Sequence, residues 1–329
     1  MARVSIVIAS SHSPFLYMPP EQWDHVRALR PVRGDVPRDS LEVNRAKHAR
    51  CMKAFATLRQ KIEAANPDLL LIFGDDQLEQ FNFSNFPSLG MFLGEEFEGW
   101  NWSGSHIRDR SAECATRRKV KGKGHPGFGK ELMTKLVAKG FDLAFSLRLP
   151  DQERGLGHAF MHPAYYLTPN YDIPILPFFV NCYYAPQPTG KRCFELGRAV
   201  RESIDESSVN LNVAIVGSGG LWHTPGLPGA YIDEEFDQAI LEFVRCGTAW
   251  EMAKYFDGLP RPHPSALPEA LERLSGGTGM SGGVGSGVGE TRNWIVAASV
   301  AGGRGTVVDY VPVYASPCGM GFAFWDASG

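Results

Sequence analysis

Polar residues that could bind a metal follow several apolar, β-branched segments of the sequence. The run LLLIF at 69–73 is followed by Gly74 and then by the polar residues DDQ at 75–77. Histidines follow other apolar runs in the same manner, namely His12, His158 and His223. Histidine with carboxylates forms catalytic zinc and non-haem Fe(II) centres, and the same residue types also serve metal-free acid–base catalysis. The residue types therefore predict one site of metal or acid–base chemistry, with both alternatives open.

The elements that must position these residues are alternating strands and helices. Apolar runs typical of buried strands lie at 4–10, 69–73, 141–147, 173–180 and 212–218. Helical periodicity lies between them, at 41–64, 128–139 and 192–205. This alternation predicts an α/β fold, with a mixed, largely parallel central sheet flanked by helices in a single large domain over residues 1–329. Ligands of such sheets bind beyond the carboxyl ends of the strands, so the histidines, the acids and Gln77 should meet at one edge.

The composition is that of a soluble protein. The chain of 329 residues is 43% hydrophobic and carries a net charge of -3, which gives no sign of affinity for nucleic acid or an anionic membrane. Its 6 cysteines form no CxxC pair, which suits a reducing compartment better than a disulfide framework. The segment MARVSIVIASSHS is typical of a first strand rather than a secretory signal, and no run approaches the roughly 20 apolar residues of a membrane span. We therefore expect a cytoplasmic protein.

Two stretches interrupt the alternation of strands and helices. Residues 81–104 are rich in aromatic residues and have little periodicity. They could form a surface loop that docks on the core or a lid over an aromatic ligand, because long loops are often functional. We assign 81–120 as a lid-like insert. Residues 275–290 form a glycine-rich linker, and the segment that follows it should pack back onto the main body.

Three glycine-rich stretches resemble nucleotide-binding motifs but lack their context. GKGHPG at 122–127 follows no buried strand, and GHPGFGK at 124–130 is followed by Glu131 where a P-loop needs Ser or Thr. GSGGLW at 217–222 follows a good strand but has Trp222 in place of the last glycine. The sequence therefore does not favour nucleotide binding.

Several motifs of the chain carry a family resemblance. In order, they are SSHSP, FGDDQLEQF, GHPGFGKELMTKLVAKGFDLA, GLGHAF, SGGLWH, IDEEFDQAIL and TRNWIVAASVAG. From about residue 4 to residue 300, the chain resembles the class III extradiol ring-cleaving dioxygenases, the superfamily of the protocatechuate 4,5-dioxygenase beta subunit. The gallate and 3-O-methylgallate dioxygenase branch is the most similar. The resemblance implies Fe(II)-dependent insertion of O₂ into a catechol- or gallate-type ring.

The resemblance also implies roles for individual residues. His12 matches the first iron-ligand histidine, and Glu235 in EEFD matches the glutamate ligand. His158 in GHAF matches a catalytic acid–base histidine, and His125 in GHPGFGKEL matches a second functional histidine near the substrate. His223 in GGLWH matches a histidine beside the active site, and we group it with the catalytic residues.

One position departs from the family pattern. An Asp-His pair is usual after the second strand, and its histidine is the second iron ligand, whereas this chain has Asp76-Gln77. A glutamine carbonyl oxygen can bind a metal more weakly than imidazole does. The change therefore allows a His/Gln/Glu site, a ligand supplied by His223 or Asp75, or loss of the metal.

The resulting assignment has a metal site and a substrate site. The predicted Fe(II) ligands are His12, Gln77 and Glu235, and the predicted substrate contacts are Asp76, Phe81 and Trp222. The expected partners are a small aromatic diol, O₂ and a second copy of the chain in a homodimer. Two alternatives remain: a metal-dependent hydrolase on the same scaffold, because histidine and glutamate also bind zinc, and a metal-poor binding protein, for which Gln77 is the main argument.

Overall fold

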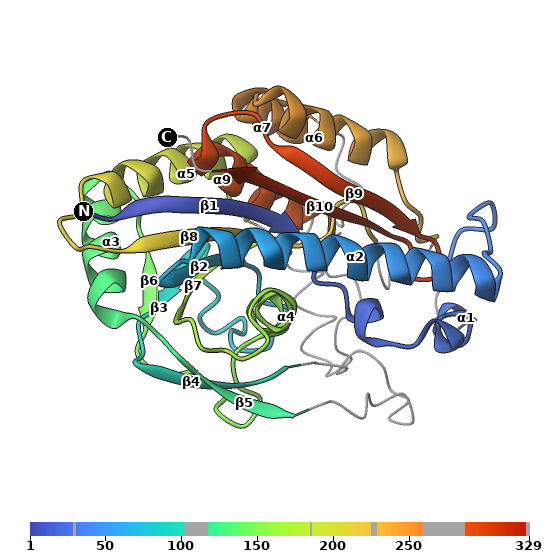
Figure 1. The fold of residues 1–329 in the computed structure, drawn as a ribbon, viewed down its shortest axis with the longest axis horizontal. Helices are drawn as coiled ribbons and strands as arrows, with labels where there is room; N and C mark the ends of the chain where they lie inside the picture. The colour runs from blue at the N-terminus through green and yellow to red at the C-terminus, as the bar shows by residue number, and fades with distance from the viewer. Residues whose placement is uncertain (29–30, 102–117, 185, 225–228, 259–286, 327–329) are drawn as a thin grey trace.

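A twisted sheet with eight strands forms the centre of the molecule (Figure 1). The computed structural model describes residues 1–28, 31–101, 118–184, 186–224, 229–258 and 287–326. The strand order is β6 (Ala144–Ser146), β3 (Leu89–Phe92), β7 (Ile175–Val180), β2 (Leu69–Gly74), β8 (Asn212–Ser218), β1 (Arg3–Ser10), β10 (Cys318–Asp326) and β9 (Thr306–Val313). The central strands β7, β2, β8 and β1 run parallel, and β3–β7, β1–β10 and β10–β9 are antiparallel pairs. The predicted α/β fold with a largely parallel sheet is confirmed.

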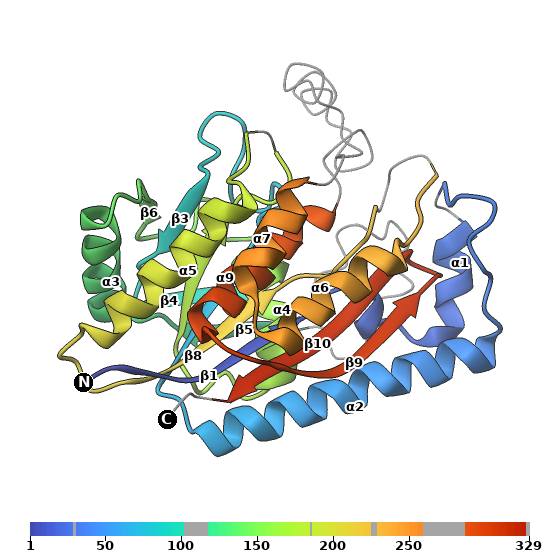
Figure 2. The same cartoon turned by 90° about the horizontal axis from the view of Figure 1, so that it is seen from above.

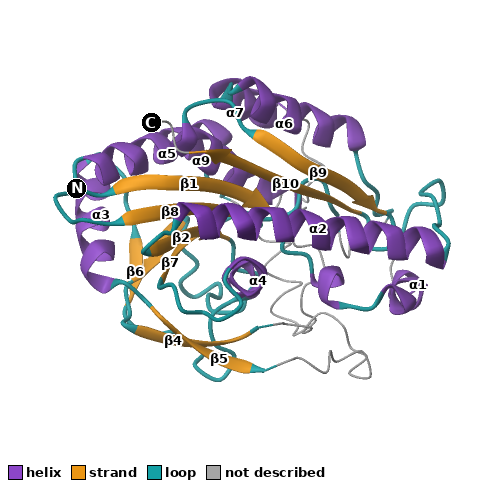
Figure 3. Ribbon diagram, in the orientation of Figure 1, coloured by secondary structure: helices purple, strands orange, loops and turns teal. Residues whose placement is uncertain are grey.

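Helices cover both faces of this sheet (Figures 2 and 3). One face packs against α1 (Trp23–Ala28), α2 (Leu41–Ala65) and α4 (His158–Leu167). The other packs against α3 (Pro126–Ala138), α5 (Gly190–Asp205), α6 (Glu234–Cys246), α7 (Ala249–Gly258) and α9 (Thr291–Ala301). Side chains of β2 alternate between the two layers, because Leu70 and Ile72 join the first core and Leu71 and Phe73 join the second. Both faces of the strand are buried, which explains its continuous apolar run.

Helix ends follow local capping chemistry. The Ser40 side chain accepts the backbone N–H of Val43 at the start of α2, and Asn66 ends this helix in the left-handed conformation. Thr189 caps α5 in the same way by accepting the N–H of Arg192. These caps explain why the helices predicted at 41–64 and 192–205 agree closely with the observed ones.

The carboxyl ends of the four parallel strands lie at one edge of the sheet. His12 follows β1, Asp75 follows β2 directly, Tyr183 follows β7 and His223 follows β8. Helix α9 packs against β8 and carries Glu290 just before its first residue. The topology therefore brings residues from distant parts of the sequence to this edge, as expected for an α/β sheet.

The two interruptions of the pattern are only partly described. Residues 81–101 include β3 and β4 (Glu96–Trp100), and β4 pairs with β5 (Lys119–Lys123). Most of the predicted linker and residues 102–117 of the predicted lid lie outside the described residues. Residues 287–290 form a 3-10 turn that leads into α9. The C-terminal segment packs onto the main body as predicted, through α9 and the β9–β10 pair.

None of the described helices is both long and apolar enough to cross a bilayer.

A glycine in β8 allows α9 to approach the sheet closely. A Cβ atom on Gly217 would lie 2.6 Å from the backbone oxygen of Asn293 and 2.9 Å from the Ala297 Cβ. Gly217→Ala should therefore lower the free energy of unfolding by about 1–3 kcal/mol, the usual effect of overpacking. Urea denaturation at equilibrium measures this change. Gly34→Ala is a suitable control, since a Cβ there meets no atom within 4 Å, and equal losses in both variants would contradict the packing argument.

Candidate metal centre

A histidine and two carboxylates form a buried cluster at the carboxyl edge of the sheet. One nitrogen or oxygen atom from each of His12, Asp75 and Glu290 lies within 4.8 Å of the others. His12 Nε2 is 3.4 Å from Glu290 Oε2 and 3.9 Å from Asp75 Oδ1. Their exposed fractions are 3%, 0% and 0%. These are the groups that the structure offers to a divalent metal.

The orientation of His12 is fixed by a serine. Ser218 Oγ donates to the backbone oxygen of Ala159 at 2.5 Å and lies 2.9 Å from His12 Nδ1. Because a hydroxyl has a single hydrogen, Ser218 must accept a hydrogen bond from His12 Nδ1–H. The neutral imidazole then carries its lone pair on Nε2, which faces the two carboxylates. An outer partner that fixes the tautomer in this way is typical of metal-ligating histidines.

Glu290 is the most heavily bonded group of the cluster. Its Oε2 accepts the backbone N–H of Gly220 at 2.7 Å, and its Oε1 accepts the Tyr183 hydroxyl and, at 3.3 Å, Gln77 Nε2. Burial alone would raise the pKa of Glu290, but the adjacent His12 and His223 hold this pKa well below its ordinary value. The group is therefore an anion held in a fixed position.

Asp75 is buried without hydrogen bonds. Neither of its carboxylate oxygens has a hydrogen-bond partner among the described residues. Burial and the nearby Glu290 raise the pKa of Asp75 well above its ordinary value. Buried polar atoms are normally satisfied, so an orphaned carboxylate calls for a further partner. A divalent cation between His12, Asp75 and Glu290 would provide one, so these residues fit a metal of the kind that the sequence predicts.

His223 lies beside this cluster with its ring orientation fixed. Its Nδ1 donates to the backbone oxygen of Leu221 at 2.9 Å, which places the lone pair of the neutral ring on Nε2. That nitrogen is 3.4 Å from Glu290 Oε1 and 3.4 Å from the Tyr183 hydroxyl. Burial opposes the charged form, but Glu290 outweighs it and raises the pKa of His223. The predicted catalytic histidine is thus placed to accept or donate a proton at Nε2.

His158 starts α4 and contacts the ring of His12. The two rings meet edge to face with centroids 4.8 Å apart, and His158 Nδ1 bonds to Glu79 Oε2 at 2.7 Å. Burial lowers the pKa of His158, but the Glu79 carboxylate outweighs this effect and raises it. A buried histidine paired with a carboxylate in this way can carry a positive charge near the metal site.

Two predicted metal ligands are placed differently from the expectation. Glu235 lies exposed in the first turn of the amphipathic α6, and the buried glutamate of the cluster is Glu290. Glu235 therefore cannot be the ligand, because an exposed carboxylate cannot join His12 in a buried site. Gln77 is near the cluster, but its amide nitrogen donates to Tyr183 and Glu290.

His125 and Asp76 serve local structure. The His125 side chain accepts the backbone N–H of Phe128 and so caps α3. The Asp76 carboxylate accepts the backbone N–H groups of the turn that follows it, namely Glu79, Gln80 and Phe81. Burial and the nearby Glu79 raise the pKa of Asp76 to about 7. The structure thus places neither side chain in the cluster of His12, Asp75 and Glu290.

The two predicted aromatic contacts belong to packed clusters. Phe81 packs against Phe179 with tilted rings whose centroids are 4.8 Å apart. It belongs to a group of rings beside Tyr183 that also contains Phe83, Phe86 and Tyr184. Trp222 is 5% exposed and packs against Tyr231 and Phe236. The described aromatics of the insert thus pack on the core, and the lid assigned to 81–120 stays a prediction, since 102–117 lie outside the described residues.

Asp237, next to Trp222, supports a pH-dependent prediction. It accepts the Trp222 backbone N–H and the Tyr310 hydroxyl, and burial raises its pKa to about 8. An unfolded aspartate has a pKa of about 3.9, so between about pH 4 and about pH 8 only the folded state holds this proton. Stability must then fall as the pH rises through this window. Asp237→Asn should weaken that dependence, as urea denaturation at about pH 5 and about pH 8 measures; an unchanged slope would contradict the buried neutral acid.

Sequence reasoning missed three residues of the site. Tyr183 follows β7 as the histidines follow other strands, and the same strand-end argument would have found it if tyrosine had been considered. Glu79 lies two residues after Gln77 in FGDDQLEQF. Glu290 directly precedes TRNWIVAASVAG, whose first ten residues are all buried. A carboxylate that leads into a wholly buried helix is itself a signal of burial.

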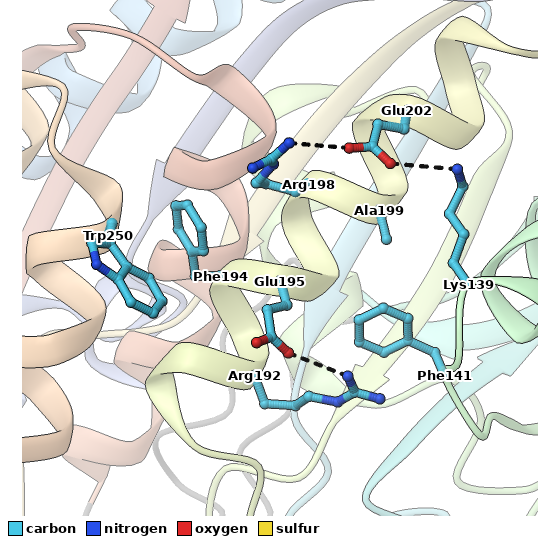
Figure 4. A pocket seen from close by; sticks show the side chains of 9 residues that line it. All are labelled: Lys139, Phe141, Arg192, Phe194, Glu195, Arg198, Ala199, Glu202 and Trp250. Atoms are coloured by element: carbon cyan, nitrogen blue, oxygen red, sulfur yellow. Dashed lines mark hydrogen bonds and ion pairs between the residues drawn. The ribbon is translucent and has the colours of Figure 1, made fainter.

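An open hollow over α5 does not have the character of an active site (Figure 4). It measures about 490 Å³, and its lining includes Phe141, Phe194 and Trp250. Its charges pair with one another, because Glu202 lies 3.3 Å from Arg198 and 3.4 Å from Lys139. Arg192 pairs with Glu195 at 3.3 Å and Lys139 also pairs with Glu206 at 2.9 Å, so each charged side chain of the lining already has a partner of opposite charge.

Comparison with known proteins connects this chain to a family. A family profile described as the catalytic LigB subunit of aromatic ring-opening dioxygenase matches residues 35–266. This range includes the turn after β2 and His223, whereas His12 and Glu290 lie outside it.

Individual relatives match over shorter segments. The chain is 29% identical over 186 residues to a 2,3-dihydroxyphenylpropionate/2,3-dihydroxicinnamic acid 1,2-dioxygenase of Photorhabdus laumondii, covering 55% of this chain and 50% of that protein. It is 31% identical over 177 residues to dioxygenase 2 of the same name from Pseudomonas putida, covering 52% and 48%. It is 30% identical over 125 residues to the gallate dioxygenase of Pseudomonas putida, covering 37% and 35%. The chain thus spans about half the length or less of these relatives.

A solved structure of an uncharacterized protein from Escherichia coli K12 is similar over 98% of this chain and 99% of that chain, with 12% identity and a TM-score of 0.48. We draw nothing from a similarity at that level.

Proposed function

Because the chain belongs to the LigB family of catalytic subunits of aromatic ring-opening dioxygenases, we propose that it is an Fe(II)-dependent extradiol dioxygenase. Its substrate would be a catechol- or gallate-type ring, cleaved next to the hydroxyl groups by O₂. The observation that carries the proposal is the buried cluster of His12, Asp75 and Glu290 at the carboxyl edge of the sheet.

His12 and Glu290 would hold the metal, with Asp75 close to both. Bound Fe(II) would supply a Lewis-acidic, redox-active centre that brings the two hydroxyl oxygens of the ring together with O₂. The chain prepares this site through the serine that fixes His12 and through the bonds that hold Glu290. Such fixed outer partners keep ligands in place.

His223 and His158 would manage protons and charge. His223 Nε2 carries the lone pair of the neutral ring and lies beside the Tyr183 hydroxyl, so it can take the proton of a substrate hydroxyl group. His158, held by Glu79 and in contact with the His12 ring, can stabilise negative charge near His12. The two histidines thus have separate roles.

The names of the relatives support a class of substrate. The relatives are named for 2,3-dihydroxyphenylpropionate, 2,3-dihydroxycinnamic acid and gallate. These compounds share adjacent ring hydroxyls, so we propose that the substrate is a vicinal aromatic diol. We also propose that the enzyme acts in the cytoplasm as a homodimer, and gel filtration of the purified chain tests the dimer.

Anaerobic loading with Fe(II) followed by oxygen tests the proposal. Catechol, gallate, 3-O-methylgallate and 2,3-dihydroxyphenylpropionate are offered in turn, and oxygen uptake is recorded with the ring-opened chromophore. Equimolar uptake and product with one of these diols is the expected result. Zinc-dependent turnover without oxygen would favour a hydrolase. A chain that retains no metal and turns over none of these diols would favour a binding protein.

A further inference from the structure

The turn after β2 contains two residues that could complete the metal site, Asp75 and Gln77. Asp75 lies near His12 and Glu290, whereas Gln77 contacts Glu290, and the two residues present different groups to the cluster. Only one of the two is placed to be a ligand. The inference below rests on the proposed metal-dependent function.

Asp75 presents a buried carboxylate that is not satisfied by hydrogen bonds within the described structure. It is 0% exposed, and neither oxygen forms a hydrogen bond with a described residue. Protonation would not resolve this, because the O–H of a carboxylic acid also needs an acceptor. Its Oδ1 lies 3.9 Å from His12 Nε2. A cation at this point would satisfy Asp75.

The spacing of the three groups suits a bound ion. Ligand atoms that are each about 2.1 Å from a metal lie roughly 3–4 Å from one another. His12 Nε2 is 3.4 Å from Glu290 Oε2 and 3.9 Å from Asp75 Oδ1. The three donors therefore surround a space of the right size before any ion is bound.

Gln77 presents the wrong end of its amide. The Tyr183 hydroxyl donates to Glu290 Oε1, so its oxygen is left to accept from Gln77 Nε2 at 2.8 Å. The same NH₂ group donates to Glu290 Oε1 at 3.3 Å. Turning the amide over would place its carbonyl oxygen against the Glu290 carboxylate. The NH₂ group cannot ligate a metal, so the carbonyl oxygen is the only donor of Gln77, and it points away from Glu290.

We infer that Asp75 is the third protein ligand, with His12 and Glu290, and that Gln77 is a positioning residue that holds Glu290. The donor set is then one imidazole and two carboxylates. Such an oxygen-rich set suits hard divalent ions, including Mn²⁺. Mn²⁺ therefore serves as a probe of the site, independent of turnover.

Mn²⁺ titration of the full metal-free chain tests this assignment. Binding is measured by calorimetry and by the loss of the EPR signal of free Mn²⁺. Asp75→Asn keeps the size of the side chain and removes its charge, and it should weaken binding by more than the roughly 10–100-fold that loss of an outer partner produces. Gln77→Leu should weaken it less. The assignment would be overturned if Gln77→Leu lost more Mn²⁺ affinity than Asp75→Asn. It would also be overturned if Asp75→Asn bound Mn²⁺ as wild type does, or if wild type took up no Mn²⁺.

A second measurement separates ligation from a purely structural role. Without metal, Asp75→Asn should melt at or above the temperature of wild type, because it removes the charge of a buried carboxylate but leaves a polar group in its place. With Mn²⁺, wild type should gain stability and Asp75→Asn should not. Asp76→Asn is the matched control, since Asp76 is also buried but its oxygens are bonded to the turn; it should keep the Mn²⁺ response.

Failure of the ligand assignment can be distinguished from failure of the proposed reaction. Mn²⁺ binding through Asp75 without cleavage of any diol would contradict the dioxygenase alone. Diol cleavage by Asp75→Asn at full metal content would contradict the ligand assignment alone.

Discussion

His223→Gln should lower the rate of ring cleavage by roughly 10²–10⁴-fold, the usual contribution of a general acid–base group, while the bound metal is retained. Glutamine can fill the space of the histidine but cannot carry a proton at the position of Nε2. That nitrogen is 3.4 Å from both Tyr183 and Glu290, so it can reach the proton of a diol held there. Oxygen uptake under steady-state conditions gives kcat and kcat/KM, and elemental analysis gives the metal content.

The control for this experiment is a histidine remote from the cluster. His48 lies half-buried in α2 and its Nε2 bonds to the backbone oxygen of Leu16 at 3.0 Å. His48→Gln should leave the rate within a small factor of wild type. An unchanged rate in His223→Gln would remove His223 from the proposed mechanism, and loss of metal from it would instead make His223 a ligand.

Glu290→Gln should weaken metal binding by more than the roughly 10–100-fold expected for an outer partner, and ring cleavage should fall with it. The substitution keeps the shape of the side chain but removes the anion that faces His12 Nε2 at 3.4 Å. It also places an amide where Tyr183 and Gln77 now donate to a carboxylate. Calorimetric titration with Mn²⁺ and oxygen uptake with Fe(II) measure the two losses.

Glu235→Gln distinguishes the structural assignment from the one based on sequence. Glu235 is exposed on α6, so this variant should bind metal and cleave substrate as wild type does. The reverse result, with Glu235→Gln inactive and Glu290→Gln active, would restore the assignment made from the EEFD motif. Circular dichroism of both variants verifies that each is folded.

The central part of the fold was predictable because its patterns are local. The strands predicted at 4–10, 69–73 and 212–218 correspond closely to β1, β2 and β8, since strands buried on both faces read as continuous apolar runs. The strand predicted at 141–147 contains the edge strand β6, whereas β3, β10 and β9 were not predicted. The short β3 contains Gly90 and runs antiparallel to β7, a pairing that depends on distant residues.

The site was predictable only as far as the strand-end argument reaches. That argument found His12, His158 and His223, but the family resemblance selected Glu235 and missed Glu290, although both glutamates stand near the start of a helix. The deciding difference is tertiary. Helix α6 is amphipathic and leaves Glu235 in solvent, whereas α9 is buried along its first ten residues and takes Glu290 inside with it.

The conformation of the turn after β2 explains why the sequence predicted Gln77, and not Asp75, as a metal ligand. Leu78 adopts a left-handed backbone conformation with φ of 62°, which is uncommon for a residue other than glycine. The Asp76 carboxylate holds this turn through the backbone N–H groups that follow it. This geometry decides which side chain faces the cluster, and no periodicity in the sequence encodes it.

The order in which the cluster residues occur along the chain has a consequence for folding. His12 comes from the first strand and Glu290 from the start of a late helix, so loops of more than two hundred residues must close before both are in place. A metal that needs both residues cannot bind a partly synthesised or partly unfolded chain with native affinity. Binding therefore adds its free energy only to the completed structure and makes its unfolding more cooperative. Release of the ion would then report the global unfolding of the protein.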